Sequence, residues 1–138
     1  MSQLWSSSKI PPPPTTTTTT TGPIRRFGQI IKLKPEHVAK YKEIHAAVWP
    51  GVLEQIKDSN IRDYSIFHDP DSGILFASFK YVGTDYEADM KRMRENPKVR
   101  EWWKLTDSLQ ESFVPGAKSS EDGEPAWWKG VEEVFYTP

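Results

Sequence analysis

The feature that most restricts the fold of this chain is a pair of strand-like runs separated by a short turn sequence. Residues 62–68 and residues 74–82 each alternate in side-chain type with a period of two, which is the spacing of a β-strand. The five residues between them are Asp, Pro, Asp, Ser and Gly, all of which favour turns. The sequence therefore predicts an antiparallel hairpin, and both faces of this hairpin carry apolar residues.

The region before the hairpin predicts one strand and a broken helix. Residues 24–33 alternate as a strand, and apolar side chains at helical spacing follow over residues 35–49. Pro50 and Gly51 are expected to kink or restart this helix, which then continues to about residue 58.

The region after the hairpin predicts two more helices and a last strand. Thr84 and Glu87 have the spacing of a capping box, so a helix is expected over residues 85–94. Another helix is expected to start at the Asn-Pro pair before residue 98 and to continue until a Val-Pro-Gly sequence interrupts it at residues 114–116. After a charged loop, residues 131–136 are expected to form the terminal strand.

This order of elements, βαββαβ, predicts an α+β fold with a ferredoxin-like antiparallel sheet and its helices on one face. The other face of the sheet would then be uncovered, although the hairpin is apolar on both faces. We expect that face to line a pocket or to pack against a second copy, so the pattern predicts a homodimer.

The chain is expected to hold one folded domain, at residues 24–138, after a tail at residues 1–23. Four prolines followed by seven threonines dominate this tail, which has no periodic apolar face. We interpret the tail as a solvated leader, with a ligand for a proline-binding module as the alternative.

The composition excludes several classes of function. With 18 basic and 19 acidic residues, the chain has no electrostatic footprint for nucleic acid. Cysteine is absent and the three histidines have no metal-ligand spacing, so neither a metal nor another cofactor is expected. No apolar run is long enough to span a membrane and no secretory signal is visible, so a cytoplasmic protein is expected.

One helical row contains the best candidate for catalysis. Tyr41, His45 and Trp49 are spaced four residues apart and would share one face of a helix. An imidazole ionises near neutral pH and could transfer protons to and from a small hydroxylated molecule. The alternative from the residues alone is a core histidine that bonds to Tyr41 or to the backbone.

Further candidates lie later in the chain. Trp102 and Trp103 are adjacent on a predicted helix and project about 100° apart, so one of them can face a pocket; otherwise they divide between core and interface. Asp107 could accept a hydrogen bond from a ligand hydroxyl, or could simply be hydrated. Tyr64 could bind a ligand, or could be a packing residue whose hydroxyl needs a partner.

Taken together, the ordered motifs resemble the L-rhamnose mutarotase family over residues 25–138. The matching segments are the Tyr-x-x-x-His row, the Trp-Pro at residues 49–50, the Asp-Tyr-Ser-Ile at residues 63–66, the Trp-Trp-Lys at residues 102–104, the Thr-Asp at residues 106–107 and the Glu-Glu-Val-Phe-Tyr-Thr-Pro ending. Members of this family are dimeric α/β-barrel proteins that interconvert the α and β anomers of L-rhamnose without a cofactor.

The resemblance implies specific roles for this chain's residues. His45 would take the place of the catalytic proton donor, and Tyr41, Tyr64, Trp102 and Trp103 the places of residues that bind the sugar. Residues 46–48 and the 118–128 segment depart from the bacterial pattern, which leaves the second proton-transfer group open. The alternatives are a sugar-binding or interaction module of the same dimeric fold, without catalysis, and a cofactor-independent monooxygenase-like protein.

Overall fold

The computed structural model describes residues 24–138, and the predicted tail lies outside them. The described elements follow in the order β1 (Arg25–Leu33), a short 3-10 helix η1 (Pro35–His37), α1 (Val38–His45), α2 (Pro50–Asp58), β2 (Ile61–Asp69), β3 (Ile74–Tyr81), α3 (Tyr86–Glu95), α4 (Pro97–Leu109), β4 (Gln110–Glu111) and β5 (Lys129–Val131). No helix within residues 24–138 is long and apolar enough to cross a membrane.

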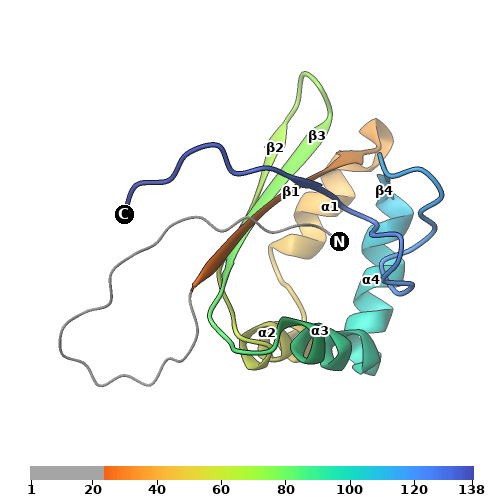
Figure 1. Cartoon of the computed structure of the whole chain (residues 1–138). Helices are drawn as coiled ribbons and strands as arrows, with labels where there is room; N and C mark the ends of the chain where they lie inside the picture. The colour runs from red at the N-terminus through yellow and green to blue at the C-terminus, as the bar shows by residue number, and fades with distance from the viewer. Residues whose placement is uncertain (1–23) are drawn as a thin grey trace.

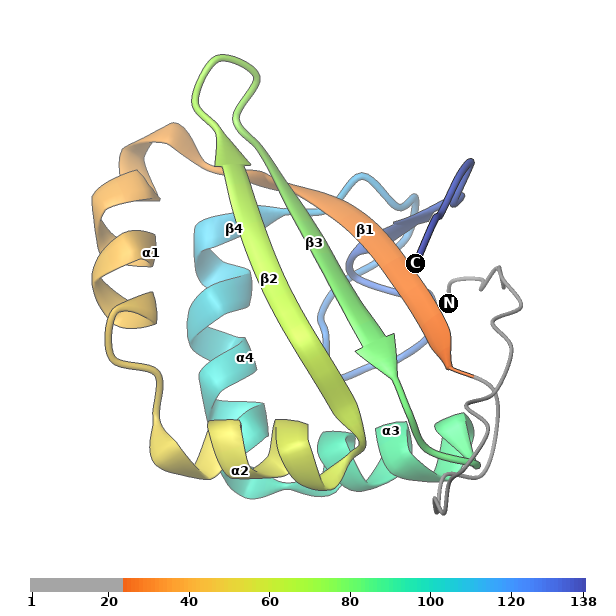
Figure 2. The same ribbon diagram turned by 90° about the vertical axis from the view of Figure 1, so that its left-hand side faces the viewer.

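The strands form one antiparallel sheet in the order β2-β3-β1-β4, and β5 also pairs with β1. The predicted mixed α+β architecture is confirmed: the sheet curls, and Figure 1 shows the helices on one side of it. Figure 2 shows β2 passing in front of α4, with β3 beside β2. The predicted hairpin is also present, and Gly73 closes its turn with a φ of 77° and a hydrogen bond to the Asp69 carbonyl.

The inner face of the sheet carries the core. Alternate side chains of β1 and β3 point toward the helices, and the register aligns Phe27 with Phe79 and Ile31 with Leu75. Two buried clusters result. The first comprises Phe27, Ile61, Phe79, Tyr81, Met93 and Val99. The second comprises Ile31, Leu33, Tyr41, Leu75 and Leu109. Residues of the second cluster, and side chains packed against the first, also line the cavity described below.

The structure corrects the predicted extent of the first helix. We expected one helical face to run through Val48 and Trp49, but α1 ends at His45 and a turn follows. Trp49 has an extended backbone, with φ −60° and ψ 134°, and is the residue at the N-cap position of α2 instead. The reason is Pro50, which sterically disfavours a helical conformation at the residue before it.

Three further boundaries differ from the sequence predictions. The helix α4 ends at Leu109, because Gln110 adopts an extended conformation and pairs with Leu33 of β1. The last strand stops at Val131, where its pairing with β1 ends, and the expected continuation to residue 136 is wrong. The cap of α3 is Asp85 rather than Thr84, since its carboxylate accepts a hydrogen bond from the Ala88 backbone N–H.

A buried carboxylate connects α3 to the sheet. Asp89 accepts hydrogen bonds from Tyr81 Oη, from Asn60 Nδ2 at 2.9 Å and from an Arg92 guanidinium nitrogen at 2.7 Å. Burial alone would raise the pKa of this carboxyl group, but these three donors lower it below its ordinary value. The stabilisation is therefore present at neutral pH and is lost as the pH falls through that lowered pKa.

We predict that Asp89→Asn lowers the free energy of unfolding by about 2 kcal/mol, because the amide cannot accept all three hydrogen bonds. Urea unfolding at pH 7 measures this loss. Asp63→Asn is the matched control, since Asp63 makes an exposed ion pair with Lys80 and its loss should cost less than about 1 kcal/mol. Equal losses in the two variants would contradict a special role for the buried carboxylate.

Candidate active site

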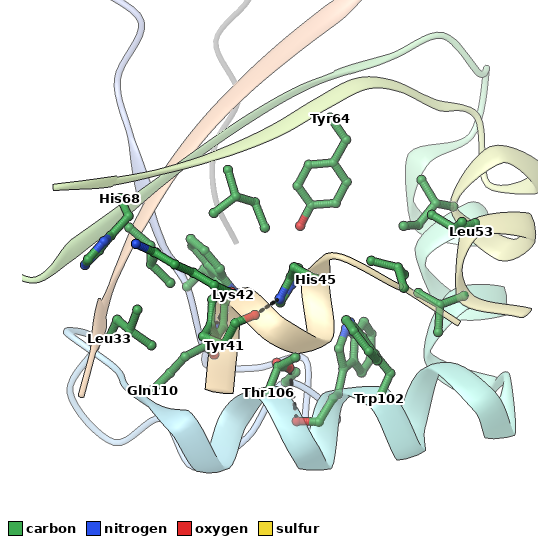
Figure 3. A pocket seen from close by; sticks show the side chains of 18 residues that line it. Leu33, Tyr41, Lys42, His45, Leu53, Tyr64, His68, Trp102, Thr106 and Gln110 are labelled. Atoms are coloured by element: carbon green, nitrogen blue, oxygen red, sulfur yellow. Dashed lines mark hydrogen bonds between the residues drawn. The ribbon is translucent and has the colours of Figure 1, made fainter. Parts of the chain in front are cut away.

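A cavity of about 510 Å³ lies between the helices and the inner face of the sheet. Side chains from α1, α2, β2, β3 and α4 line it, together with Ser120 and Trp128 from the segment before β5. Figure 3 shows that His45 and Tyr64 approach its centre from opposite sides, from α1 and β2. Four of the predicted site residues besides His45 line it, and they are Tyr41, Tyr64, Trp102 and Trp103.

His45 is held with one ring nitrogen occupied. Its Nδ1 lies 2.9 Å from the backbone oxygen of Tyr41, one helical turn earlier. A carbonyl oxygen can only accept, so Nδ1 carries the hydrogen and Nε2 keeps a free lone pair in the neutral ring. Burial lowers the pKa of the imidazole, although the bond to the Tyr41 carbonyl partly opposes this shift. At neutral pH the ring is therefore neutral, and Nε2 can accept a proton.

Two aromatic rings fix the orientation of the imidazole. The Tyr41 ring stacks on His45 with a centroid distance of 4.2 Å, and the Trp102 ring meets it edge-on at 5.2 Å. Trp49, in turn, contacts Trp102 edge-on at 5.1 Å. Trp49 is not among the residues that line the cavity, so its part in the site is to support Trp102.

Tyr64 reaches the cavity because of a bulge in β2. The register between β2 and β3 shifts between Arg62 and Ser65, and Asp63 has a positive φ of 51°. The extra residue brings Tyr64 onto the same face of the strand as Ile66. The residue as a whole is 39% exposed, yet its hydroxyl points into the cavity (Figure 3). Burial of that oxygen raises the pKa of Tyr64 to about 12, so the phenol stays protonated at neutral pH.

Both adjacent tryptophans of α4 line the cavity, where the sequence had predicted that one of them could face a pocket. Trp102 is only 6% exposed and lies against His45, while Trp103 also packs against the first core cluster. The curl of the sheet and the segment before β5 enclose a wide sector of α4 (Figure 1), so side chains about 100° apart can border the same cavity.

Asp107 is placed differently from the other candidates. Its two carboxylate oxygens accept hydrogen bonds from the backbone N–H of Ser120, at 2.8 Å, and from the Ser120 hydroxyl, at 2.7 Å. Glu121 extends this attachment, with ion pairs to Lys104 and Arg100 at 2.9 Å each. Burial raises the pKa of Asp107, and the bonds from Ser120 partly offset this. Asp107 thus holds the 118–128 segment against α4 instead of facing the cavity.

Sequence reasoning missed several residues that line the cavity. They include Lys42, Thr106 and Gln110. His68, which the predicted alternation of residues 62–68 places on the same face as Tyr64, lines the cavity as well. Gln110 could not be found from the sequence, because the predicted helix ran past it and concealed its pairing with β1. Within residues 24–138, no group of three or more His, Asp or Glu side chains could hold a metal ion.

Comparison with known proteins identifies the family. The model of the L-rhamnose mutarotase family matches residues 26–137. The chain belongs to the L-rhamnose mutarotase family. An L-rhamnose mutarotase of Phocaeicola vulgatus is 38% identical over 79 residues, which cover 57% of this chain and 73% of that protein. The Bacillus subtilis L-rhamnose mutarotase is 29% identical over 113 residues, 82% of this chain and 98% of that protein.

A solved structure of this family is also similar. The crystal structure of L-rhamnose mutarotase from Formosa agariphila superposes with a TM-score of 0.61 at 28% sequence identity. The match covers 82% of this chain and 98% of the Formosa chain. The architecture described above is therefore shared with a solved member of the L-rhamnose mutarotase family.

We predict that His45 titrates below the usual range of histidine and that its neutral form carries the hydrogen on Nδ1. Burial disfavours the imidazolium, and the Tyr41 carbonyl accepts only from a protonated Nδ1. Nitrogen-15 NMR of histidine-labelled protein measures both properties, with His45→Gln used to assign the signal. A neutral ring with its hydrogen on Nε2 would contradict this assignment.

Proposed function

We propose that this member of the L-rhamnose mutarotase family interconverts the α and β anomers of L-rhamnose, or of a close 6-deoxy sugar, without a cofactor. The observation that carries this proposal is the pairing of a proton acceptor with a proton donor across one cavity. His45 offers a free Nε2, Tyr64 offers a protonated hydroxyl, and the two approach the centre of the cavity from opposite sides (Figure 3).

The proposed reaction opens and recloses the pyranose ring. Nε2 of His45 removes the proton of the anomeric hydroxyl while the bond between C1 and the ring oxygen breaks, and the Tyr64 hydroxyl delivers a proton to that ring oxygen. The aldehyde rotates about the C1–C2 bond. In the reverse steps, the Tyr64 phenolate recovers its proton and the imidazolium of His45 returns one to the former carbonyl oxygen, so no proton is gained or lost. His45 is thus an acceptor in ring opening and a donor in ring closure.

The indoles have a separate task. Trp102 and Trp103 would present flat apolar surfaces to the C–H faces and the methyl group of the sugar. They would also exclude water from the region between His45 and Tyr64, where each polar interaction is then stronger than in bulk solvent. Proximity and orientation, with positioned acid–base groups, are then the sources of acceleration.

A binding module without catalysis would have the same fold, because architecture alone does not decide chemistry. The placement of His45 supports the enzyme: it lines an open cavity with Tyr41 and Trp102 instead of being enclosed in the core. A monooxygenase-like reaction would consume oxygen, which an oxygen electrode detects.

We predict that His45→Ala lowers the protein-dependent rate of anomer exchange by about 100-fold or more, the usual contribution of positioned acid–base catalysis. Saturation transfer between the two anomeric proton signals of L-rhamnose measures this rate. Tyr64→Phe should lower the same rate while keeping the aromatic ring.

His37→Ala is the matched control, since this histidine lies in η1 and does not line the cavity. The control should keep the wild-type rate. Exchange at the wild-type rate in His45→Ala would refute the assignment, and a wild-type protein that does not accelerate exchange would refute the proposed function.

We also propose that the chain forms a homodimer of the ferredoxin-like, dimeric α/β-barrel type through the outer face of its sheet. The register places Phe67 and Ile30 on either side of Phe76 on this face. Phe67 is 64% exposed and Phe76 47% exposed. Neighbouring exposed aromatic side chains on a sheet face favour burial against another protein surface, and a second copy offers a matching one.

We predict that a charge at position 76 prevents formation of the dimer. Wild-type protein should elute at twice the chain mass of 15.9 kDa in size-exclusion chromatography with light scattering. Phe76→Glu should shift the protein to the monomer, because it would bury a charge at the interface, whereas Phe76→Leu should remain a dimer. Wild-type protein that elutes as a monomer at micromolar concentration would rule out the dimer.

A further inference from the structure

Three side chains from distant parts of the sequence form a row of hydrogen bonds that ends at Tyr41. The indole N–H of Trp127 donates to Oε1 of Gln110 at 2.9 Å. Nε2 of Gln110 donates in turn to the hydroxyl oxygen of Tyr41 at 3.0 Å. Gln110 is 3% exposed and Tyr41 is 5% exposed, so bulk water does not compete freely for either group.

The chemistry of the indole sets the direction of the whole row. An indole nitrogen can donate a hydrogen bond but cannot accept one, so the Gln110 atom that faces Trp127 must be the oxygen. The amide nitrogen of Gln110 then faces Tyr41, and an amide nitrogen accepts nothing. The hydroxyl of Tyr41 is therefore an acceptor toward Gln110, and its own hydrogen must point elsewhere.

The hydroxyl hydrogen of Tyr41 can reach an acceptor only on the side of the cavity. Tyr41 lines the cavity, and no side chain of the described residues accepts its hydroxyl hydrogen. Burial also raises the pKa of the phenol well above its ordinary value, so the hydrogen is retained at neutral pH. The cavity is the side from which an acceptor can reach this hydrogen, and an oxygen atom of a ligand bound there can serve as that acceptor.

The backbone of Trp127 is itself held in place. The hydroxyl of Ser112 donates to the Trp127 carbonyl at 2.6 Å, which ties the residues before β5 to the chain after β4. The Trp127 ring packs against the second core cluster, which includes Tyr41 and Leu109. The indole is thus supported by both its backbone and its ring, and can keep the Gln110 amide in one orientation.

We propose that Trp127 is a positioning residue that acts through Gln110 to make Tyr41 a hydrogen-bond donor to an oxygen of the bound sugar. Without the indole N–H, the Gln110 amide can turn over and present its oxygen to Tyr41. The phenol would then donate to Gln110, and the sugar would lose a donor. The inference deepens the proposed function and rests on it only for the identity of the ligand.

A double-mutant cycle tests this inference in the full-length chain, with Trp127→Phe, Tyr41→Phe and the double variant. Trp127→Phe keeps an aromatic ring but removes the N–H. We expect it to lower kcat/KM for L-rhamnose about three- to tenfold, the effect of one lost hydrogen bond, mainly through KM. In the Tyr41→Phe background the same substitution should have no further effect, because the hydroxyl is already absent.

A purely structural role for Trp127 predicts a different outcome. Loss of packing would reduce kcat/KM by the same factor in both backgrounds, and that result would overturn the proposal. Thermal unfolding of all four proteins checks that each variant is folded at the assay temperature. Should the wild type bind L-rhamnose without exchanging its anomers, the proposed function fails, and calorimetric dissociation constants supply the same cycle.

A second measurement needs no ligand at all. The Raman doublet of tyrosine distinguishes a phenol that accepts a hydrogen bond from one that donates, and a difference spectrum against the Tyr41→Phe background isolates Tyr41. We expect an acceptor signature to change toward a donor signature in Trp127→Phe. An unchanged doublet would show that the indole does not set the direction of the row, and would overturn the inference whatever the enzyme's activity.

Discussion

The antiparallel pairing of β1 with β3 is the constraint on which the rest of the structure depends. It fixes which side chains face the helices, with Phe27 opposite Phe79 and Ile31 opposite Leu75. Side chains alternate across a strand, so a slip of one residue would turn this apolar row outward and remove the surface against which the helices pack. The position of His45 on α1, opposite the inner face of the sheet, therefore depends on strand register as well as on helix packing.

The bulge in β2 modifies this constraint at one point. Ile61 is paired with Tyr81 and faces inward, so uninterrupted alternation would turn Tyr64 outward. The extra residue at Asp63 reverses the alternation from there on and brings Tyr64 into the cavity. One irregular residue thus converts an outward-facing position into one that faces the cavity, and the pairing with β3 resumes after it with the register shifted by one residue.

The sequence predicted those features that depend on local patterns. The hairpin, the mixed α+β class and the shared face of Tyr41 and His45 follow from periodicities of two and four residues, and the structure contains them all. The sequence did not predict the end of α4 at Leu109. Helix propensity is a local property and contains no information about the pairing of Gln110 with β1. The contact of Trp127 with Gln110 likewise joins a loop to a strand, and no spacing in the sequence encodes it.

Burial shifts the pKa values of His45 and Tyr64, the two groups that we propose for proton transfer, in opposite directions. Removing water disfavours whichever form is charged, so it lowers the pKa of His45 and raises that of Tyr64. The same apolar cavity therefore favours the neutral imidazole, and it moves the phenol, which is protonated at neutral pH in water as well, further from ionisation. A mutarotase needs this combination, since one oxygen must lose a proton while another gains one.

A more polar cavity would bring the two pKa values toward those in water, where histidine is partly charged near neutral pH and a smaller fraction could accept a proton. In the proposed reaction, the apolar lining by the tryptophans would consequently contribute to the acid–base chemistry as well as to contact with the sugar.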